Sequence, residues 1–533
     1  MRNPFELKER PGEEAPKEVY GHRPYLLAFA ASWASAMYGY DSAFIGGTMS
    51  LPSFQAAYGL TNVSKQARAA LSSNIVSTFQ GGAFFGCAIG FFLAERWGRK
   101  ISMLISAVVF MVGAGLQLAG NLGCLYAGRA LTGLGVGASA MILPIYVSEC
   151  SPALIRGRLV GVFEIMLQVA LVFGFWVNYG VNQNIPGDTD EQWHIPVAVQ
   201  FVPAGLLLIS LAPMPESPRW YASKGRMAEA AKSLSWIRHL PEDHPYVLRE
   251  LSVIETAITH EVEATAHGGR RTYGQMAREL TQKGIRNRLV IAFAMVLLQN
   301  LTGINAVNYY SPSIFQSIGY TGTSTGLLAT GIFGIIKMFA TIVYAAILVD
   351  RFGRRPLLIF GGIFAGLAMF YLGVYSKVSN SFVSTPPRDA GANTAVAMVY
   401  IYAFFYGCSW NGIPWLFTSE VLPTRIRTLG MTVTICFQWL TQFMVVYSLP
   451  YMILGISYGT FLFFGACTVV AIVFAWLFVP ETKGVQLEDM DLLFGPDVSV
   501  FAKQAHANYT RAVGARAVVR DEKIGAVVEE AEV

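Results

Sequence analysis

The stretch Leu297–Phe315, LLQNLTGINAVNYYSPSIF, lies inside an apolar segment that is long enough to cross a membrane. It nevertheless carries amide and phenol side chains at Gln299, Asn300, Asn305, Asn308, Tyr309 and Tyr310. An amide without a hydrogen-bond partner costs several kcal/mol in hydrocarbon, so these groups need a polar cavity or a partner helix. Simple hydrogen-bonded packing between transmembrane helices is one explanation. So many polar groups in one span favour a binding site instead.

The same stretch has the pattern of a broken helix. Asn305, Asn308, Tyr309 and Pro312 recur at i, i+3, i+4 and i+7, which places them on one helix face. Gly303 and Pro312 are positions at which that helix can bend or break. Transporters build substrate sites from broken helices near the middle of the membrane, so we expect a transport site here.

The composition indicates a polytopic membrane protein. The chain has 533 residues, of which 53% are hydrophobic and 14% charged, whereas a soluble domain is about one quarter charged. The net charge of +5 reports topology in such a protein and gives no reason to expect nucleic-acid binding. Six scattered cysteines form no metal spacing, and no phosphate loop or nucleophile motif is present. We therefore expect neither an enzyme nor a cofactor.

Apolar runs predict an all-α protein of about twelve spans in two six-helix bundles. The spans are expected at 25–49, 70–94, 101–120, 123–148, 158–181, 194–213, 287–316, 325–349, 356–376, 393–418, 428–453 and 458–479. The bundles then cover 25–213 and 287–479, with a helical linker at 214–286 and terminal segments at 1–24 and 480–533. Basic connections at 95–100, 156–158, 350–355 and 425–427 predict that these loops, the linker and both termini are cytoplasmic.

The loop at 50–69 is then extracellular. It contains Asn62-Val63-Ser64, which fits the pattern of a glycosylation site. Because the pattern is short, a chance match is the alternative.

An internal repeat relates the two halves. ERWGRK (95–100) matches DRFGRR (350–355), PIYVSECSPALIRGRL matches PWLFTSEVLPTRIRTLG, and PESPRW (215–220) matches PETKG (480–484). Correspondences at equivalent places indicate a duplicated six-span half, with the substrate bound between the two copies near the midplane.

These repeated motifs carry clustered charges that suit a cytoplasmic gate. Glu149 with Arg156, and Glu420 with Arg425, could pair across helix ends and latch the inward face. Exposed pairs contribute little singly, so a network is needed, and a role in topology and folding alone is the alternative. The candidate gate residues are Glu95, Arg96, Arg99, Glu149, Arg156, Asp350, Arg351, Arg354, Glu420 and Arg425.

Taken together, the motifs resemble the sugar porter family of the major facilitator superfamily. The resemblance rests on the paired GR[KR] loops, PESPRW, PETK, GYD in the first span and QNxxGIN in the seventh, and it covers nearly the whole chain. Within the family, GYDSAFIG (39–46), FWVNYG (175–180), TGIFGIIKM (330–338) and SWNGIPW (409–415) are most similar to fungal quinate permeases. That subgroup includes carriers of other sugar acids such as galacturonate.

The resemblance implies which side chains bind substrate. The family pattern falls on Gln299, Asn300, Asn305, Tyr309, Trp415, Gln438, Trp439 and Gln442. Two departures argue against a simple neutral-hexose site. Glu164 stands where the family has Gln, with Gln168 one turn further along, and Met338 beside Lys337 replaces the usual Asn. Tryptophans near span ends can also belong to the interfacial belt, but polar neighbours favour ring stacking on substrate for Trp415 and Trp439.

Four charged residues lie inside expected spans, where a charge is costly and indicates function. Asp41 and Arg129 match the acid–base pair of proton-coupled family members, and a permanent structural pair in a uniporter is the alternative. Lys337 supplies a compact cation for a carboxylate substrate. Alternatively, it pairs with Glu164 or extends toward an interface. The role of Glu164 itself stays open.

The prediction is a plasma-membrane secondary transporter that imports quinate or a related polyhydroxy acid with protons by alternating access. The alternatives are a galacturonate carrier, a neutral monosaccharide carrier and a nutrient sensor that does not transport. The expected partners are a small-molecule substrate, protons and membrane lipid, and we expect a monomer.

Overall fold

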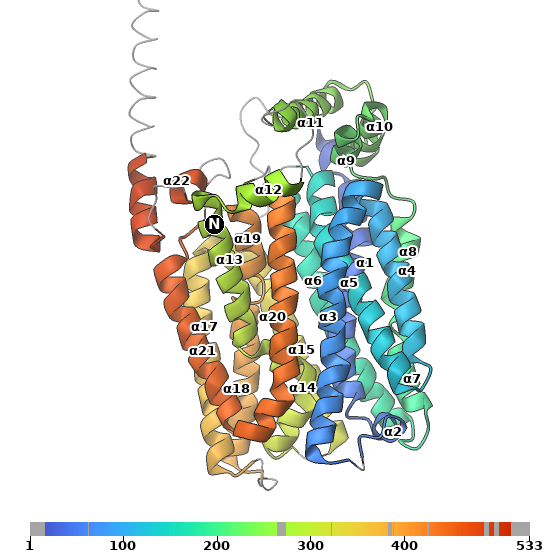
Figure 1. The fold of residues 1–533 in the computed structure, drawn as a ribbon, viewed down its shortest axis with the longest axis vertical. Coiled ribbons are helices and arrows are strands. Elements are labelled where there is room, and N and C mark those ends of the chain that lie inside the picture. The colour runs from blue at the N-terminus through green and yellow to red at the C-terminus, as the bar shows by residue number, and fades with distance from the viewer. Residues whose placement is uncertain are drawn as a thin grey trace, which may run out of the picture.

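A computed structural model describes residues 16–512 except 62, 153, 264–272, 321, 382–385, 387, 424–425, 484, 486–489 and 495–499. Every regular element in this part of the chain is a helix, and the long helices run roughly parallel to one another (Figure 1). The expectation of an all-α protein is confirmed.

The first half supplies one bundle of long helices. They are α1 (His22–Thr48), α3 (Lys65–Trp97), α4 (Arg99–Gln117), α5 (Leu122–Cys150), α6 (Arg156–Asn184) and the consecutive pair α7 (Glu191–Ala198) and α8 (Phe201–Leu211). The short η1 (Lys17–Tyr20) precedes them, and α2 (Pro52–Ala57) lies in the connection between α1 and α3.

The second half repeats this arrangement, with more interruptions. Its helices are α13 (Lys283–Leu301) with α14 (Ile304–Ser317), α15 (Thr323–Val343) with η2 (Tyr344–Leu348) and α16 (Val349–Phe352), α17 (Arg354–Val378), α18 (Ala390–Gly407) with α19 (Ile413–Val421), α20 (Arg427–Ile456) and α21 (Gly459–Phe478). Ten helices or helix runs of the described chain are long and apolar enough to cross a membrane. Together with α1 and the α18–α19 pair, they form the predicted pair of six-span bundles.

Small residues allow the helices within a bundle to approach closely. A Cβ atom on Gly133 or Gly137 of α5 would lie 2.0 Å from the carbonyl oxygen of Phe79 or Ala83 in α3. Such contacts between backbones stabilise helix pairs in lipid, where burial gives little driving force. They hold α3 and α5 together as one unit.

The main contacts between the bundles are those of α3 with α20, α6 with α15 and α1 with α14. In the last pair, a Cβ atom on Gly46 would lie 2.2 Å from the carbonyl oxygen of Tyr309. Near the same end, Asn182 of α6 donates a hydrogen bond of 2.7 Å to Ser324 of α15. The seventh span therefore touches the first bundle directly.

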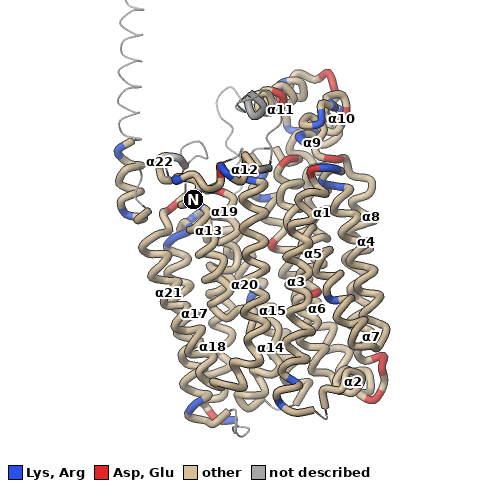
Figure 2. The backbone as a smooth tube through the Cα atoms, viewed as in Figure 1, with Lys and Arg blue, Asp and Glu red and all other residues tan. Residues whose placement is uncertain are grey.

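The segment between the halves forms α9 (Pro218–Ser223), α10 (Met227–Arg238), α11 (Pro245–Glu263) and α12 (Tyr273–Leu280). These helices lie at one end of the bundles, which we call the linker face (Figure 1). Arg238 ties α10 to both neighbours, because it pairs with Glu250 of α11 at 2.6 Å and donates to the carbonyl oxygen of Cys150 at 2.8 Å. Charged residues gather at the linker face and become sparse along the middle of the bundles (Figure 2).

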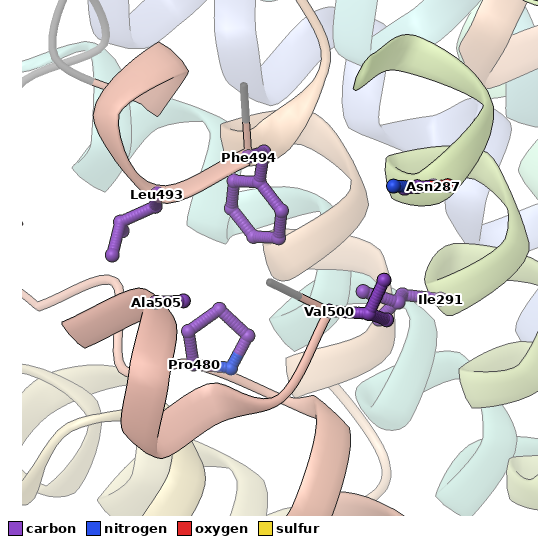
Figure 3. A pocket seen from close by; sticks show the side chains of 7 residues that line it. All are labelled: Asn287, Ile291, Pro480, Leu493, Phe494, Val500 and Ala505. Atoms are coloured by element: carbon purple, nitrogen blue, oxygen red, sulfur yellow. The ribbon is translucent and has the colours of Figure 1, made fainter. Parts of the chain in front are cut away.

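The end of the described chain also packs at the linker face. α22 (Met490–Phe494) lies beside the start of α13, where the Arg288 guanidinium is 5.5 Å from the ring centroid of Phe494. A small, mostly apolar pocket opens between them (Figure 3), lined by Asn287, Ile291, Pro480, Leu493, Phe494, Val500 and Ala505. It lies away from the polar residues of the seventh span.

Candidate functional site

The seventh span is broken at both positions expected from the sequence. α13 ends at Leu301 and α14 begins at Ile304, with Gly303 at φ +93° between them. Only glycine adopts this backbone easily, and a Cβ atom here would lie 3.0 Å from Phe464. Tyr310, two residues before Pro312, has non-helical angles of φ −121° and ψ 15°. The proline lacks an N–H donor and its ring crowds the preceding turn, which explains this second bend.

The amides at the first break are held by neighbouring groups. The Asn300 side chain donates to the Thr441 hydroxyl at 2.9 Å and accepts from the Asn305 amide at 2.6 Å. Gln299 donates to the carbonyl oxygens of Trp410 and Asn411 at 2.8 and 3.0 Å. The breaks in the seventh and tenth spans are therefore joined through Gln299.

Tyr309 connects the seventh span to both bundles. Its hydroxyl donates to Ser42 of α1 at 3.3 Å and accepts from the Gln442 amide of α20 at 3.4 Å. Its side chain is almost fully buried. A bond between its hydroxyl and Ser42 links the site helix to the residue next to Asp41.

Asp41 and Arg129 form the ion pair that the sequence led us to expect. The Arg129 Nη1 and Asp41 Oδ1 atoms are 2.5 Å apart, and neither side chain is exposed. Arg129 also donates to the carbonyl oxygen of Ile75 at 3.2 Å and lies 4.8 Å from the ring centroid of Phe79. Removing one partner of such a pair costs about 3–5 kcal/mol, because a buried charge is left uncompensated.

A second charged group lies between the bundles. Glu164 of α6 accepts from Gln168 at 3.0 Å and from the Asn411 amide across the interface. Lys337 of α15 is 3% exposed and interacts electrostatically with Glu164. The two form no direct salt bridge among the described side chains, and the Lys337 Nζ lies 5.9 Å from the ring centroid of Tyr406.

The three tryptophans differ in their surroundings. Trp410 is fully buried and donates to the carbonyl oxygen of Leu358 at 2.9 Å, so it supports the fold. Trp439 packs edge-on against Tyr38, with ring centroids 5.1 Å apart, and its indole N–H has no partner in the described structure. Trp415 is half-buried and lies 6.4 Å from the ring of Phe163.

Several buried polar atoms around this region have no hydrogen-bond partner in the part of the chain that the structure describes. They are Asp41 Oδ2, Arg129 Nη2, Gln168 Oε1, Gln299 Oε1, Asn308 Oδ1, the Tyr310 hydroxyl and Trp439 Nε1. Leaving such a group unpaired costs about 1–3 kcal/mol. Unpaired donors and acceptors of this kind suit a solute that carries several hydroxyl groups.

Sequence reasoning missed four contributors to this arrangement: Tyr38, Tyr406, Asn411 and Thr441. Asn411 lies within the SWNGIPW motif and Tyr38 directly precedes GYD. Both residues could therefore have been found from the sequence as polar side chains within or next to the family motifs. Gln438 is among the residues predicted to bind substrate. Its side chain is buried, one helical turn from Gln442.

The linker face repeats one ionic network in both bundles. Arg99 pairs with Glu149 at 3.1 Å, and the Ser217 hydroxyl donates to Glu149 at 2.5 Å. In the second half, Arg354 pairs with Glu420 at 2.6 Å, and the Thr482 hydroxyl donates to Glu420 at 2.7 Å. Each network joins helices of a single bundle.

Two further carboxylates complete the repeat. Glu216 accepts the backbone N–H groups of Arg99 and Lys100, and Glu481 accepts those of Arg354 and Arg355. Burial raises the pKa of the Glu216 carboxyl, although these N–H bonds favour its charged form. A Cβ atom on Gly98 or Gly353 would lie 2.3 or 2.5 Å from the matching carboxylate, so both turns require glycine.

The predicted Glu149–Arg156 pair is wrong in this conformation, because Glu149 binds Arg99 and Ser217 instead. Glu95 lies 3.5 Å from Arg99, while Arg96 is exposed. The backbone carbonyl oxygen of Arg351 accepts a hydrogen bond of 2.9 Å from the Lys483 ammonium. Asn62, Arg425 and the side chain of Asp350 lie outside the described residues.

Comparisons with known proteins agree with this architecture. The family model described as "Sugar (and other) transporter" matches residues 27–494. A "Probable quinate permease" of Neosartorya fischeri is 43% identical over 494 residues, which cover 92% of this chain and 90% of that protein. A protein of the same name from Aspergillus niger is 43% identical over 493 residues, with the same coverage.

Solved structures of the xylose transporter XylE from E. coli have a similar fold. A partially occluded inward-open form matches with a TM-score of 0.72 and 26% identity, over 87% of this chain and 100% of that one. The proton:xylose symporter XylE bound to 6-bromo-6-deoxy-D-glucose matches with a TM-score of 0.72 and 27% identity, over 88% and 99% of the two chains.

Proposed function

Because the chain belongs to the sugar porter family of the major facilitator superfamily, we propose that it imports quinate or a related polyhydroxy acid together with protons. The observation that carries the proposal is a buried cation, Lys337, in a protein whose seventh span also buries the unpaired amide oxygens of Gln299 and Asn308. The ammonium would bind the carboxylate of the substrate, while the Gln and Asn side chains bind its hydroxyl groups.

Proton coupling is assigned to Asp41. Protonation would remove the charge of Asp41 and release Arg129, which changes the interactions between α1 and α5. The Tyr309–Ser42 hydrogen bond connects α14 to α1, so a shift of α1 on protonation would also move α14. In this mechanism the two bundles alternate between orientations that open the site to either side of the membrane.

We expect the protein to lie in the plasma membrane, with the linker face and its many basic residues on the cytoplasmic side. Import of an anion then runs against an inside-negative potential, at a cost of about 2.3 kcal/mol per charge and 100 mV. A co-transported proton offsets that cost. This gives a physical reason for an acid carrier in this family to be proton-coupled.

A galacturonate carrier would use the same residues, because that substrate also joins a carboxylate to several hydroxyl groups. A neutral monosaccharide carrier is the second candidate. It is favoured by the amide set, because amides such as those of Asn300 and Asn305 would bind hydroxyl groups whether or not the substrate carries a carboxylate. It leaves the buried charge of Lys337 without a role in recognition.

Uptake of radiolabelled quinate by cells expressing the chain tests the proposal. We expect uptake that is fastest at acid pH, is abolished by an uncoupler and is inhibited by unlabelled quinate more strongly than by glucose. Selective inhibition by galacturonate would move the substrate and keep the mechanism. Glucose uptake that is indifferent to the uncoupler would overturn the proposal.

The role of Lys337 is tested by Lys337→Met, with Lys337→Arg as the matched control that keeps the charge. We expect the methionine variant to lose about tenfold or more in quinate affinity, because a charge-assisted hydrogen bond contributes about 1.5–3 kcal/mol. Unchanged affinity in Lys337→Met would show that the ammonium does not contact the acid.

A further inference from the structure

We propose that Glu164 is an internal counter-ion of Lys337, which the substrate carboxylate replaces while Glu164 takes up a proton. The inference rests on the proposed function, because it requires an acid as substrate. It gives the carrier a second proton-binding residue besides Asp41, and it makes Glu164 a determinant of substrate charge.

The geometry places Glu164 where such a replacement can occur. Its carboxylate belongs to the first bundle, yet it accepts a hydrogen bond from Asn411 in the second. Lys337, also in the second bundle, is its electrostatic partner without a direct salt bridge. The side chain of Glu164 is partly buried and reaches the interface between the bundles. A substrate carboxylate can therefore approach the ammonium more closely than Glu164 does.

The charges around Glu164 explain why a proton must follow the substrate. The titratable groups facing it are Tyr38 of α1, Lys337 of α15 and Tyr406 of α18. Tyrosine hydroxyls are neutral near pH 7, and Asp41 is balanced by Arg129. The empty site thus contains one carboxylate and one ammonium, with no net charge.

A bound anion would leave this mostly buried site with a net negative charge, which is unfavourable in surroundings of low dielectric constant. Transfer of one proton from the open side to the Glu164 carboxylate restores neutrality. By linkage, substrate binding and proton binding strengthen each other equally. A neutral sugar creates no such excess charge and needs no proton at Glu164.

The proton also changes the contact between the bundles. The Asn411 amide donates to a charged acceptor while Glu164 is ionised, and hydrogen bonds of that kind are about twice as strong as neutral ones. Protonation weakens this link across the interface just when the substrate is bound. The loaded carrier is then freer to reorient than an empty carrier with ionised Glu164.

The test compares quinate with its neutral amide, quinamide, on the purified full chain. In weakly buffered solution with a pH indicator, we expect the wild type to take up one more proton on binding quinate than on binding quinamide. Equal proton uptake for the two ligands overturns the inference and leaves the proposed function intact. Failure of the wild type to bind or transport quinate or galacturonate overturns both.

Proteoliposomes supply a second, independent readout, namely the charge moved per labelled quinate. With protons on Asp41 and Glu164 and one negative charge on quinate, the wild type should move one net positive charge. Glu164→Gln should transport quinate without net charge and bind it about tenfold more tightly at alkaline pH, because the competing carboxylate is gone. Glu229→Gln, in the exposed Arg226–Glu229 pair of α10, is the matched control and should behave as wild type.

A Glu164→Gln carrier that moves the same charge per quinate as the wild type overturns the inference. If that variant does not fold, the proton uptake of the wild type decides by itself. The double variant Glu164→Gln, Lys337→Met completes the set. Its site is neutral without a counter-ion, so it should prefer quinamide to quinate, and a retained preference for quinate contradicts the proposal.

Discussion

Tyr309 of α14 donates a hydrogen bond of 3.3 Å to Ser42, the residue that follows Asp41 in α1. The bond crosses from the second bundle to the first, and it ends one residue from the buried Asp41–Arg129 pair. A change of charge at Asp41 can therefore act on the broken seventh span, in which α14 carries Asn305 and α13 carries Gln299 and Asn300.

Tyr309→Phe should weaken coupling between proton and substrate transport. The substitution keeps the ring and removes the hydroxyl that donates to Ser42 and accepts from Gln442. The bond to Ser42 is worth about 0.5–1.5 kcal/mol, so we expect an accumulation ratio about threefold to tenfold lower. Tyr400→Phe is the matched control, because it removes a hydroxyl bond of the same 3.3 Å length, to Ala329, away from the ion pair. Accumulation ratios that fall equally in both variants would rule out a special role for Tyr309.

Asp41→Asn should strongly reduce uphill transport and preserve exchange. The variant loses the proton carried by Asp41, so accumulation should fall to the level that the proton on Glu164 alone supports, while counterflow between labelled and unlabelled pools continues. Since Arg129 loses its charged partner, surface expression and thermal stability must be measured beside transport. Accumulation equal to that of the wild type in a well-expressed variant would refute the coupling role of Asp41.

Gly46→Ala should favour conformations in which the bundles separate at the end away from the linker face. The new Cβ atom would lie 2.2 Å from the Tyr309 carbonyl oxygen, so α1 and α14 must move apart. Separation can be followed with the added variant Ser324→Cys, because Ser324 is partly buried and accepts a hydrogen bond from Asn182 here. We expect an impermeant maleimide to label this cysteine faster when the bundles separate. Gly161→Ala is the control, because nothing lies within 4 Å of its added Cβ atom. Equal labelling rates in the two alanine variants would contradict the expectation.

Glu149→Gln and Glu420→Gln should each lower thermal stability to a similar degree. Each removes the charge of one mostly buried carboxylate from an equivalent network, at an expected cost of about 1–3 kcal/mol. The effect is measured as a change in melting temperature: the detergent-solubilised protein is heated, and the folded fraction that remains is quantified by size-exclusion chromatography. A loss confined to one variant would mean that the two networks are equivalent in geometry only.

Much of the fold could be predicted from the sequence because membrane insertion imposes strong local patterns. Apolar length gave the spans, and Gly303 and Pro312 marked both bends of the seventh one. The repeated loop motifs indicated two equivalent halves, and the folded chain places the same ionic network in each.

Partners distant in the chain could not be predicted in the same way. Glu149 was matched to the nearby Arg156, but its partner Arg99 is 50 residues earlier. Glu164 and Asn411 are 247 residues apart, and no local spacing indicates their contact. Trp410 lies between α18 and α19, where helical periodicity cannot show which way a side chain faces.

The two halves of the sequence are alike in the ionic network at the linker face and differ in the charged residues near the middle of the bundles. Both copies kept the glycine turn, the arginine and the two carboxylates that tie helix ends together. Glu164 and Lys337, in contrast, come from opposite copies and have different chemistry. The ionic network is therefore present twice, whereas the Glu164 and Lys337 pair proposed to recognise the substrate is present once. A related protein with this fold could therefore change its substrate by substituting a few central side chains, while the interactions that stabilise each bundle stay the same.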